Sequence, residues 1–347
     1  MDYREAEYGI HALDFATARI EFYPHSAALP EVERSSIKAY LHRRDFTINT
    51  LAIRLDSGYY GQFLDFYGGE QDLKEGLIRV LHSLSFIEDP TRIMRAARFE
   101  QRLSFAIEAR TAELIDNALP MLSRVTGERI RHELFLILHE REPERVLSRL
   151  GGLNVLAEIH PRLVWREEFC TCFGQLRQAV ASGQWAVEPE EDGRPSPASY
   201  LALLTYPLTQ QELEALAARL KIFRNDLSLL YQVLDLKENE HKLARSEVPN
   251  RELYALLRFS SSTARMILWL CTDSERVRQR LRLYETELRQ VELTVDGEYL
   301  KGLGLKPSPL FSRLLNAVRD ARLDGEIHTE EEERALVDSL LEQWRPG

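Results

Sequence analysis

The sequence predicts an α+β fold that is predominantly α-helical, and two observations support this. Short alternating or apolar segments, typical of β-strands, occupy the first 85 residues, with turn residues between them. After residue 88 the apolar residues recur at helical spacing, and residues 200–290 are predicted to form helices of ordinary length. We therefore expect part of a small mixed sheet with one or two helices, followed by a long helical region.

Composition restricts the class of protein. The chain has 347 residues, of which 44% are hydrophobic, enough for two or more packed units. A net charge of −10 excludes a globally basic nucleic-acid binder but allows a local basic groove. No apolar run approaches the roughly 18 residues of a membrane span, and no signal peptide is recognised, so we expect no membrane partner. The cysteines Cys170, Cys172 and Cys271 cannot form a secreted disulfide framework, so we expect reduced thiols in a cytoplasmic protein.

The first elements are predicted from short-range patterns. Residues 9–23 alternate between two faces, as a strand does. Ser35 and Ser36 are candidate caps of a short helix, and residues 48–55 fit either a helix or a strand. Residues 63–66 and 77–81 are predicted strands, and we expect Asp65 to cap a tight turn at Gly68-Gly69.

The next predicted element is a helix that begins at Asp89. Asp89 suits the N-cap position and Pro90 suits the first helical position. At about 100° per residue, four arginines share an arc of roughly 120°. Such a row near a helix N-terminus suits a polyphosphate, although a capped and solvated surface helix is the alternative. These arginines are Arg92, Arg95, Arg98 and Arg102.

Further helices are predicted over residues 111–119, 128–139 and 143–150, the last ended by Gly151-Gly152. Residues 186–199 are rich in proline and acids and indicate a surface loop. Thr209 opens a capping box, and Asn225, Asn250 and Ser262 are further candidate N-caps. From residue 296 on, glycine turns flank a predicted helix over 311–322, which the residues alone favour as a plain helical cap.

Four blocks together resemble a known family. They are Arg43-Arg44-Asp45-Phe46-Thr47-Ile48-Asn49, then Asp65-Phe66-Tyr67-Gly68-Gly69 with Asp72-Leu73, then residues 88–99, then Glu128-Arg129-Ile130-Arg131-His132-Glu133-Leu134. In order and spacing they resemble the class II nucleotidyltransferases: CCA-adding, A-adding and bacterial poly(A) polymerase enzymes. The resemblance covers about residues 10–140 and returns near residues 296–333. The segment 81–99 resembles the A-adding branch most.

The resemblance implies a domain order and a reaction. A truncated polymerase-β-like nucleotidyltransferase head would span residues 1–85, a helical neck with the nucleotide-binding helix 86–150, a helical body 151–290, and a tRNA-contacting tail 291–347. The reaction implied is addition of A, C or both to the 3′ end of tRNA or another RNA, from ATP or CTP and with Mg²⁺.

The resemblance also implies roles for individual residues. Asp89 and Arg92 match positions that read the base: a carboxylate accepts from the exocyclic amine of adenine or cytosine, and a guanidinium donates to the ring nitrogen or to the cytosine carbonyl. Arg95 and Arg98 match positions that hold phosphates, and Arg44 matches another nucleotide contact.

Other candidate residues have less definite roles. Asp45 would bind the ribose or brace two sub-domains, and a salt bridge to its neighbour Arg43 or Arg44 is an equal alternative. Asp14 is a candidate metal-directed carboxylate on a strand. Glu128, Arg129 and Arg131 match a helix start that braces the neck or contacts the RNA primer, and we favour bracing.

The metal-binding carboxylates of the family are the main departure. Two metal ions in such a reaction need an Asp-x-Asp pair, which in the family follows a Gly-Gly…Arg-Asp motif. Neither motif occurs in these 347 residues, so we expect no metal site in this chain. We expect that upstream domains of a longer protein are missing and that this chain alone is inactive. The alternatives are a non-catalytic RNA-binding subunit and a helical scaffold.

Overall fold

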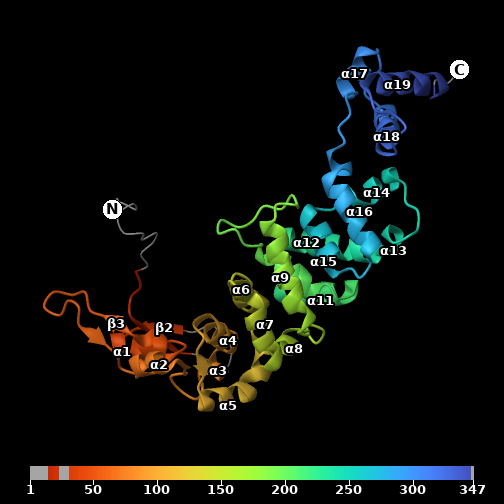
Figure 1. Cartoon of the computed structure of the whole chain (residues 1–347). Coiled ribbons are helices and arrows are strands. Elements are labelled where there is room, and N and C mark those ends of the chain that lie inside the picture. The colour runs from red at the N-terminus through yellow and green to blue at the C-terminus, as the bar shows by residue number, and fades with distance from the viewer. Residues whose placement is uncertain (1–14, 23–30, 345–347) are drawn as a thin grey trace. The chain divides into compact units, whose positions relative to one another are not determined.

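Short strand pairs characterise the amino-terminal part of the computed structural model, which describes residues 15–22 and 31–344 (Figure 1). Within these residues the strands form three separate two-stranded sheets, so the expectation of one mixed sheet is wrong. The predicted strand 77–81 is only two residues long, and it pairs with residues 106–107, for which no strand was predicted. The antiparallel pairs are β1 (Arg19–Phe22) with β2 (Glu31–Arg34) and β3 (Ala52–Ile53) with β4 (Phe63–Leu64); the parallel pair is β5 (Leu77–Ile78) with β6 (Ala106–Ile107).

The chain divides into two units, Met1–Val164 and Trp165–Gly347. The finer division into head, neck, body and tail stays a prediction. Helices of the first unit are α1 (Ile37–His42), the 3₁₀ helix η1 (Thr47–Thr50), α2 (Gly69–Glu75), α3 (Ser85–Glu88), α4 (Thr91–Leu103), α5 (Ala109–Ala118), the 3₁₀ helix η2 (Leu119–Arg124), α6 (Gly127–Leu138), α7 (Pro143–Gly152) and α8 (Val155–Ile159).

Helix α4 is the centre of the first unit. Ile93, Met94, Ala96 and Ala97 are fully buried, and the helix packs against α6 and α7. These apolar positions recur at helical spacing, so one face of α4 supplies the core contact. The packing fixes the direction of the arginines on its other face.

The turn at Gly68-Gly69 is capped as predicted. The Asp65 carboxylate accepts hydrogen bonds from the backbone N–H groups of Tyr67, Gly69 and Glu70. Gly68 has φ of +74°, and a Cβ on Gly69 would lie 2.3 Å from the Thr47 carbonyl oxygen. Glycine is therefore required by backbone conformation at Gly68 and by close approach at Gly69.

The described residues of the second unit form helices joined by loops, with no strand among them. None of the described helices in either unit is long and apolar enough to cross a membrane. Helix α12 packs on α15, which also contacts α9 and α10. The helices are α9 (Glu168–Ala181), α10 (Pro197–Thr205), α11 (Gln210–Leu220), α12 (Arg224–Glu238), α13 (Glu240–Leu243), α14 (Asn250–Leu257), α15 (Ser262–Cys271), α16 (Glu275–Thr286), the 3₁₀ helix η3 (Leu288–Gln290), α17 (Gly297–Gly302), α18 (Pro309–Leu323) and α19 (Glu330–Trp344).

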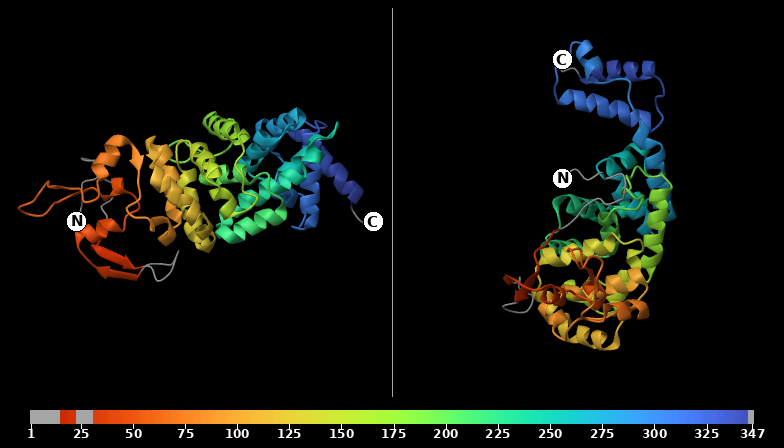
Figure 2. Two further views of the ribbon diagram at one scale, coloured as in Figure 1. Left: turned by 90° about the horizontal axis from the view of Figure 1, so that it is seen from below. Right: turned by 90° about the vertical axis from the view of Figure 1, so that its left-hand side faces the viewer.

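The last three helices share a hydrophobic cluster of their own, and α18 lies beside α19 (Figure 2). Leu300, Leu314, Val318 and Val337 are fully buried in this cluster. The residues 291–347, predicted as a tail, therefore contain enough apolar side chains to pack locally.

Helix starts were predicted with mixed success. The capping box at Thr209 is confirmed, and Ser36 caps α1. The other predicted caps are displaced: α12 begins after Phe223, α14 after Pro249, and Ser261 rather than Ser262 caps α15. At α15 two adjacent serines are similar candidate caps, and sequence alone does not distinguish positions that differ by one residue. Helix α7 likewise continues through both glycines to Gly152 instead of ending before them.

Candidate functional site

A polar cavity of about 420 Å³ lies in the first unit. Residues 43–45 form one wall, the start of α4 another, and the start of α6 a third. All of its lining side chains except Thr91 are acids, arginines or a histidine. The lining residues are Arg43, Arg44, Asp45, Asp89, Thr91, Arg92, Arg95, Glu128, Arg129, His132 and Glu133. Two of the blocks predicted from sequence and the helix between them therefore meet at one place.

Asp45 and Arg95 form the central ion pair of this cavity. Oδ2 of Asp45 accepts from Nε of Arg95 at 2.8 Å and also from Nη2, so two donors of one guanidinium converge on one carboxylate oxygen. Oδ1 accepts from the side chain of Asn49 at 2.8 Å and from the N–H of Phe46 at 2.9 Å. The carboxylate thus connects the 43–49 segment to α4.

The surroundings of Asp45 favour its charged form. Burial raises the pKa of Asp45, but the Arg95 guanidinium and the hydrogen bonds from Asn49, Arg95 and Phe46 outweigh it, so the pKa lies below its usual value. Burial likewise lowers the pKa of Arg95, and the carboxylates of Asp45 and Glu133 more than restore it. Both groups are therefore ionised at neutral pH.

Arg98 is directed away from the cavity lining. Its guanidinium lies 3.4 Å from Glu140 and 3.9 Å from Glu133, and its side chain is only 10% exposed. Arg92 is buried as well. The alternative of a solvated arginine face is therefore wrong for these two side chains, because α6 and the segment before α4 cover them.

Asp89 lies immediately before the N-cap of helix α4, one position outside the N-cap position that was predicted for it. The helix begins at Thr91 with Pro90 as its N-cap, and Oδ1 of Asp89 accepts from the Thr91 N–H at 3.1 Å and its hydroxyl at 2.6 Å. Nη2 of Arg129, from α6, lies 2.7 Å from the same oxygen. Arg129 therefore holds the Asp89 carboxylate, for which the family resemblance predicts a role in base reading.

Arg92 is held by two neutral acceptors. Nη1 donates to the Ser85 hydroxyl at 2.6 Å and Nη2 to the Arg43 carbonyl at 2.8 Å. Two bonds at different nitrogens fix the plane of the guanidinium. Asp89 and Arg92, three positions apart, thus present a fixed acceptor and a fixed donor to one cavity.

The other predicted residues are distributed as follows. Arg44 is exposed, lines the cavity and lies 5.5 Å from the centre of the Tyr40 ring. Glu128 also lines it, whereas Arg131 does not. Asp14 lies outside the described residues.

Arg43, Thr91 and His132 line the cavity but were not predicted as functional, and a sequence signal was available for His132. This histidine follows Arg129 by three positions and Glu128 by four, so these side chains share a face of α6. That helical spacing was the available signal.

The cavity combines five arginines with four carboxylates, so it can bind a group that is anionic at one end and a hydrogen-bonding heterocycle at the other.

The donor set of this cavity does not suit a divalent cation. Asp45, Asp89 and Glu133 each lie against an arginine. Among residues 15–22 and 31–344, no three His, Cys, Asp or Glu side chains are arranged to hold a metal ion. The charges of these carboxylates are already balanced by guanidinium groups.

Comparison with known families matches the two ends of the first unit. Residues 4–79 match the model of the poly A polymerase head domain. Residues 104–165 match a model described as a probable RNA and SrmB-binding site of polymerase A. The α4 arginines lie between the two matched segments.

Similar proteins cover most of this chain. The A-adding tRNA nucleotidyltransferase of Geobacter sulfurreducens is 37% identical over 95% of this chain, which spans only 38% of that protein. The A-adding tRNA nucleotidyltransferase of Halalkalibacterium halodurans is 32% identical over 96% of this chain and 75% of its own length. The solved structure of the Thermotoga maritima CCA-adding enzyme complexed with tRNA has a TM-score of 0.69 at 30% identity, covering 88% of this chain and 75% of that one.

Proposed function

Because the chain belongs to the class II tRNA nucleotidyltransferase and poly(A) polymerase family, we propose that it selects the nucleotide and binds the RNA in adding A, C or both to the 3′ end of tRNA. The observation that supports this most is the cavity in which Asp89 and Arg92 face the same space. ATP and CTP would be the substrates, and tRNA or another RNA 3′ end the acceptor. A cytoplasmic location would follow from tRNA as the substrate.

Selection of the base would follow from the hydrogen-bonding groups that Asp89 and Arg92 present to the cavity. Thr91 and Arg129 contact Oδ1 of Asp89, so we assign Oδ2 to the exocyclic amine of adenine or cytosine. Arg92 would donate to the ring nitrogen or to the cytosine carbonyl. Guanine and uracil present a carbonyl oxygen where the amine would be, leaving a carboxylate without a donor at a cost of about 1–3 kcal/mol. Protein groups would then replace a template.

Phosphate binding would use the arginines on the other side of the cavity. Arg95 and Arg44 line it and are accessible enough to meet a triphosphate. Arg98, which pairs with Glu133 and Glu140, would act on the phosphates through Arg95 and Glu133. Glu128, Arg129 and Arg131, at the start of α6, would brace the helical neck, with Arg129 also orienting Asp89.

The chemical step itself would need Mg²⁺ ligands that the described residues do not supply. We therefore expect no extension of a tRNA ending in CC when this chain alone is given ATP and Mg²⁺. Incorporation of labelled ATP that is abolished by chelating the metal would contradict this expectation.

Nucleotide binding tests the selection step without requiring chemistry. Competition against a fluorescent ATP analogue should rank ATP and CTP above GTP and UTP, by about 5- to 150-fold for one unpaired buried group. Asp89→Ala should remove this preference, while Asp56→Ala, a carboxylate on the β3–β4 hairpin outside the cavity, should keep it. Equal binding of all four nucleotides by the unaltered chain would refute the assignment.

A non-catalytic RNA-binding subunit is the second candidate, favoured by the absence of Asp-x-Asp from the sequence. It predicts salt-dependent tRNA binding together with no nucleotide preference. The competition measurement therefore separates the two candidates. A helical scaffold would show neither property.

A further inference from the structure

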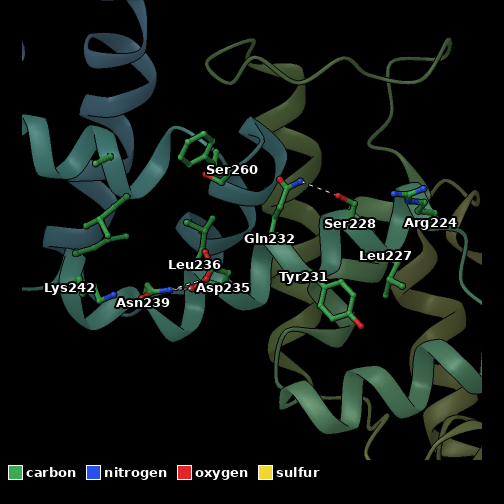
Figure 3. A pocket seen from close by; sticks show the side chains of 14 residues that line it. Arg224, Leu227, Ser228, Tyr231, Gln232, Asp235, Leu236, Asn239, Lys242 and Ser260 are labelled. Carbon is green, nitrogen blue, oxygen red and sulfur yellow. Dashed lines mark hydrogen bonds between the residues drawn. The ribbon is translucent and has the colours of Figure 1, made fainter. Parts of the chain in front are cut away.

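A groove outside the nucleotide cavity follows one face of α12 in the second unit (Figure 3). Its volume is about 690 Å³, and α13 and α14 form its other walls. The α12 residues that line it recur every three or four positions from Arg224 to Asn239. At about 1.5 Å per residue this face is about 22 Å long, the length of four helical turns. We call it the α12–α14 groove.

Apolar side chains dominate its surface. Leu227, Leu236 and Leu256 line the groove, and two aromatic side chains reach solvent at its edge: Tyr231 is 38% exposed and Phe259 80% exposed. A contiguous apolar surface with two large exposed rings is typical of an interaction site.

The central polar side chains are already hydrogen-bonded within the chain. Gln232 accepts from the Ser261 N–H at 2.7 Å and donates to the Ser228 hydroxyl at 3.4 Å. Asn239 donates to Asp235 at 3.0 Å, as the dashed lines in Figure 3 show. A ligand would therefore gain more from the leucines and rings than from these amides.

The charges at the two ends are positive. Arg224 lies at the first turn of α12 and Lys242 on α13, and neither forms an ion pair with any residue in the described ranges. Arg258 lies over the Phe259 ring at 4.4 Å. Asp235 is the one acidic side chain among the lining residues of this groove. In a chain of net charge −10, this surface is locally basic.

From this combination we propose that the α12–α14 groove binds an acidic amphipathic helix of another protein. Such a helix places apolar residues at i, i+3, i+4 and i+7 against the leucines, as in other helix-in-groove complexes. Its carboxylates, on the flanks of that stripe, meet Arg224 and Lys242 at opposite ends. The two positive side chains favour a partner of negative charge, and the apolar contacts supply the buried area.

RNA fits this groove less well. RNA binding depends on contacts to successive phosphates, and only two cations line a surface about 22 Å long. Bases stack on flat rings, whereas most of the apolar lining here is aliphatic.

The test uses the full chain and labelled peptides of about 20 residues, long enough to span the groove as a helix. One carries leucines at helical spacing with glutamates elsewhere; a second replaces every glutamate with lysine; a third scrambles the first. Fluorescence polarisation should show the acidic peptide binding at least tenfold more tightly than the other two. The double variant Arg224→Glu/Lys242→Glu should weaken the acidic peptide at least tenfold and strengthen the basic one.

Two further variants complete the test. Phe259→Ala should weaken the acidic peptide several-fold, and Lys306→Glu, an exposed charge reversal on the loop between α17 and α18, should leave its binding unchanged. Equal binding of acidic and scrambled peptides, or no effect of the double variant, overturns the proposal. If Phe259→Ala instead weakens tRNA binding, the groove belongs to RNA. If it dissociates a dimer of the unaltered chain, the groove belongs to a second copy.

Discussion

Replacing Asp45 by asparagine should destabilise the first unit while leaving the second unaffected. The carboxylate is 7% exposed and accepts two hydrogen bonds from Arg95, whose side chain is 30% exposed. Removing one member of a buried pair costs about 3–5 kcal/mol, because the other charge loses its partner. Arg95 keeps Glu133 at 3.3 Å and is partly hydrated, so we expect a smaller loss of about 2–3 kcal/mol.

The distribution of tryptophan makes the assay selective. All four tryptophans, Trp165, Trp185, Trp269 and Trp344, belong to the second unit, so their fluorescence follows that unit alone. Far-ultraviolet circular dichroism follows both units. For a unit of this size the loss corresponds to a Tm decrease of about 5–10 °C in the dichroism transition, with no change in the fluorescence transition.

Control and pH dependence test the physical cause. Asp56→Asn breaks an exposed pair with Arg54 and should change stability little. Because the folded-state pKa of Asp45 is lowered, its contribution is complete above the unfolded value of about 3.9 and is lost as the pH falls through the folded pKa. The difference between the two proteins should stay constant from about pH 7 to 5 and shrink below that range. If Asp45→Asn is as mild as Asp56→Asn, or the difference grows in acid, the buried-pair argument is refuted.

Three further predictions concern other parts of the chain. Gly69→Ala should lower the free energy of unfolding by about 1–3 kcal/mol, because its Cβ would meet the Thr47 carbonyl at 2.3 Å, whereas Gly152→Ala meets nothing within 4 Å and should be neutral or stabilising. Burial lowers the pKa of His82, with help from His42 and Arg92 and against Glu88, so the fold favours neutral imidazole. Stability should therefore be complete above about pH 6.5 and fall as the pH drops below it, and His82→Gln should flatten this loss between pH 7 and 5.5 in urea titrations. Truncation after Gln290 should weaken binding of whole tRNA, with a smaller salt dependence, and leave binding of a short single strand nearly intact; unchanged tRNA binding would reduce the tail to a structural cap.

Local spacing grouped the side chains around the start of α4, and the family resemblance added residues 43–49 and 128–134, but neither predicted how these side chains pair. Arg92 and Arg95 share helix α4 and Asp89 lies two residues before it, so short-range geometry puts these three side chains near one another whatever the rest of the chain does. Asp45 and Arg95 are 50 residues apart, and no periodic pattern reports a contact at that separation. The sequence offered Arg43 and Arg44 as equally good neighbours for Asp45. Only packing of the 43–49 segment on α4 directs that carboxylate to Arg95.

The same limit applies to the fold. β5 pairs with β6, whose residues 106–107 lie between two helices and are too few to alternate visibly. Helical segments were predicted where amphipathic spacing extends over several turns, as in α6 and α11, because each turn repeats the signal. Two-residue strands contain no repeat at all, and long-range pairing decides whether they form.

Arginine positions read from sequence overstate the positive charge available to a ligand. Four arginines recur along α4, yet Arg98 lies against Glu133 and Glu140, Arg95 is shared between Asp45 and Glu133, and Arg102 lies 3.8 Å from Glu140. A triphosphate in the cavity would thus compete with Asp45 and Glu133 for the Arg95 guanidinium instead of meeting a bare cationic row. Balanced charge of this kind lowers nonspecific affinity for polyanions, so the nucleotide discrimination that we propose would rest on the geometry of Asp89 and Arg92 rather than on attraction alone.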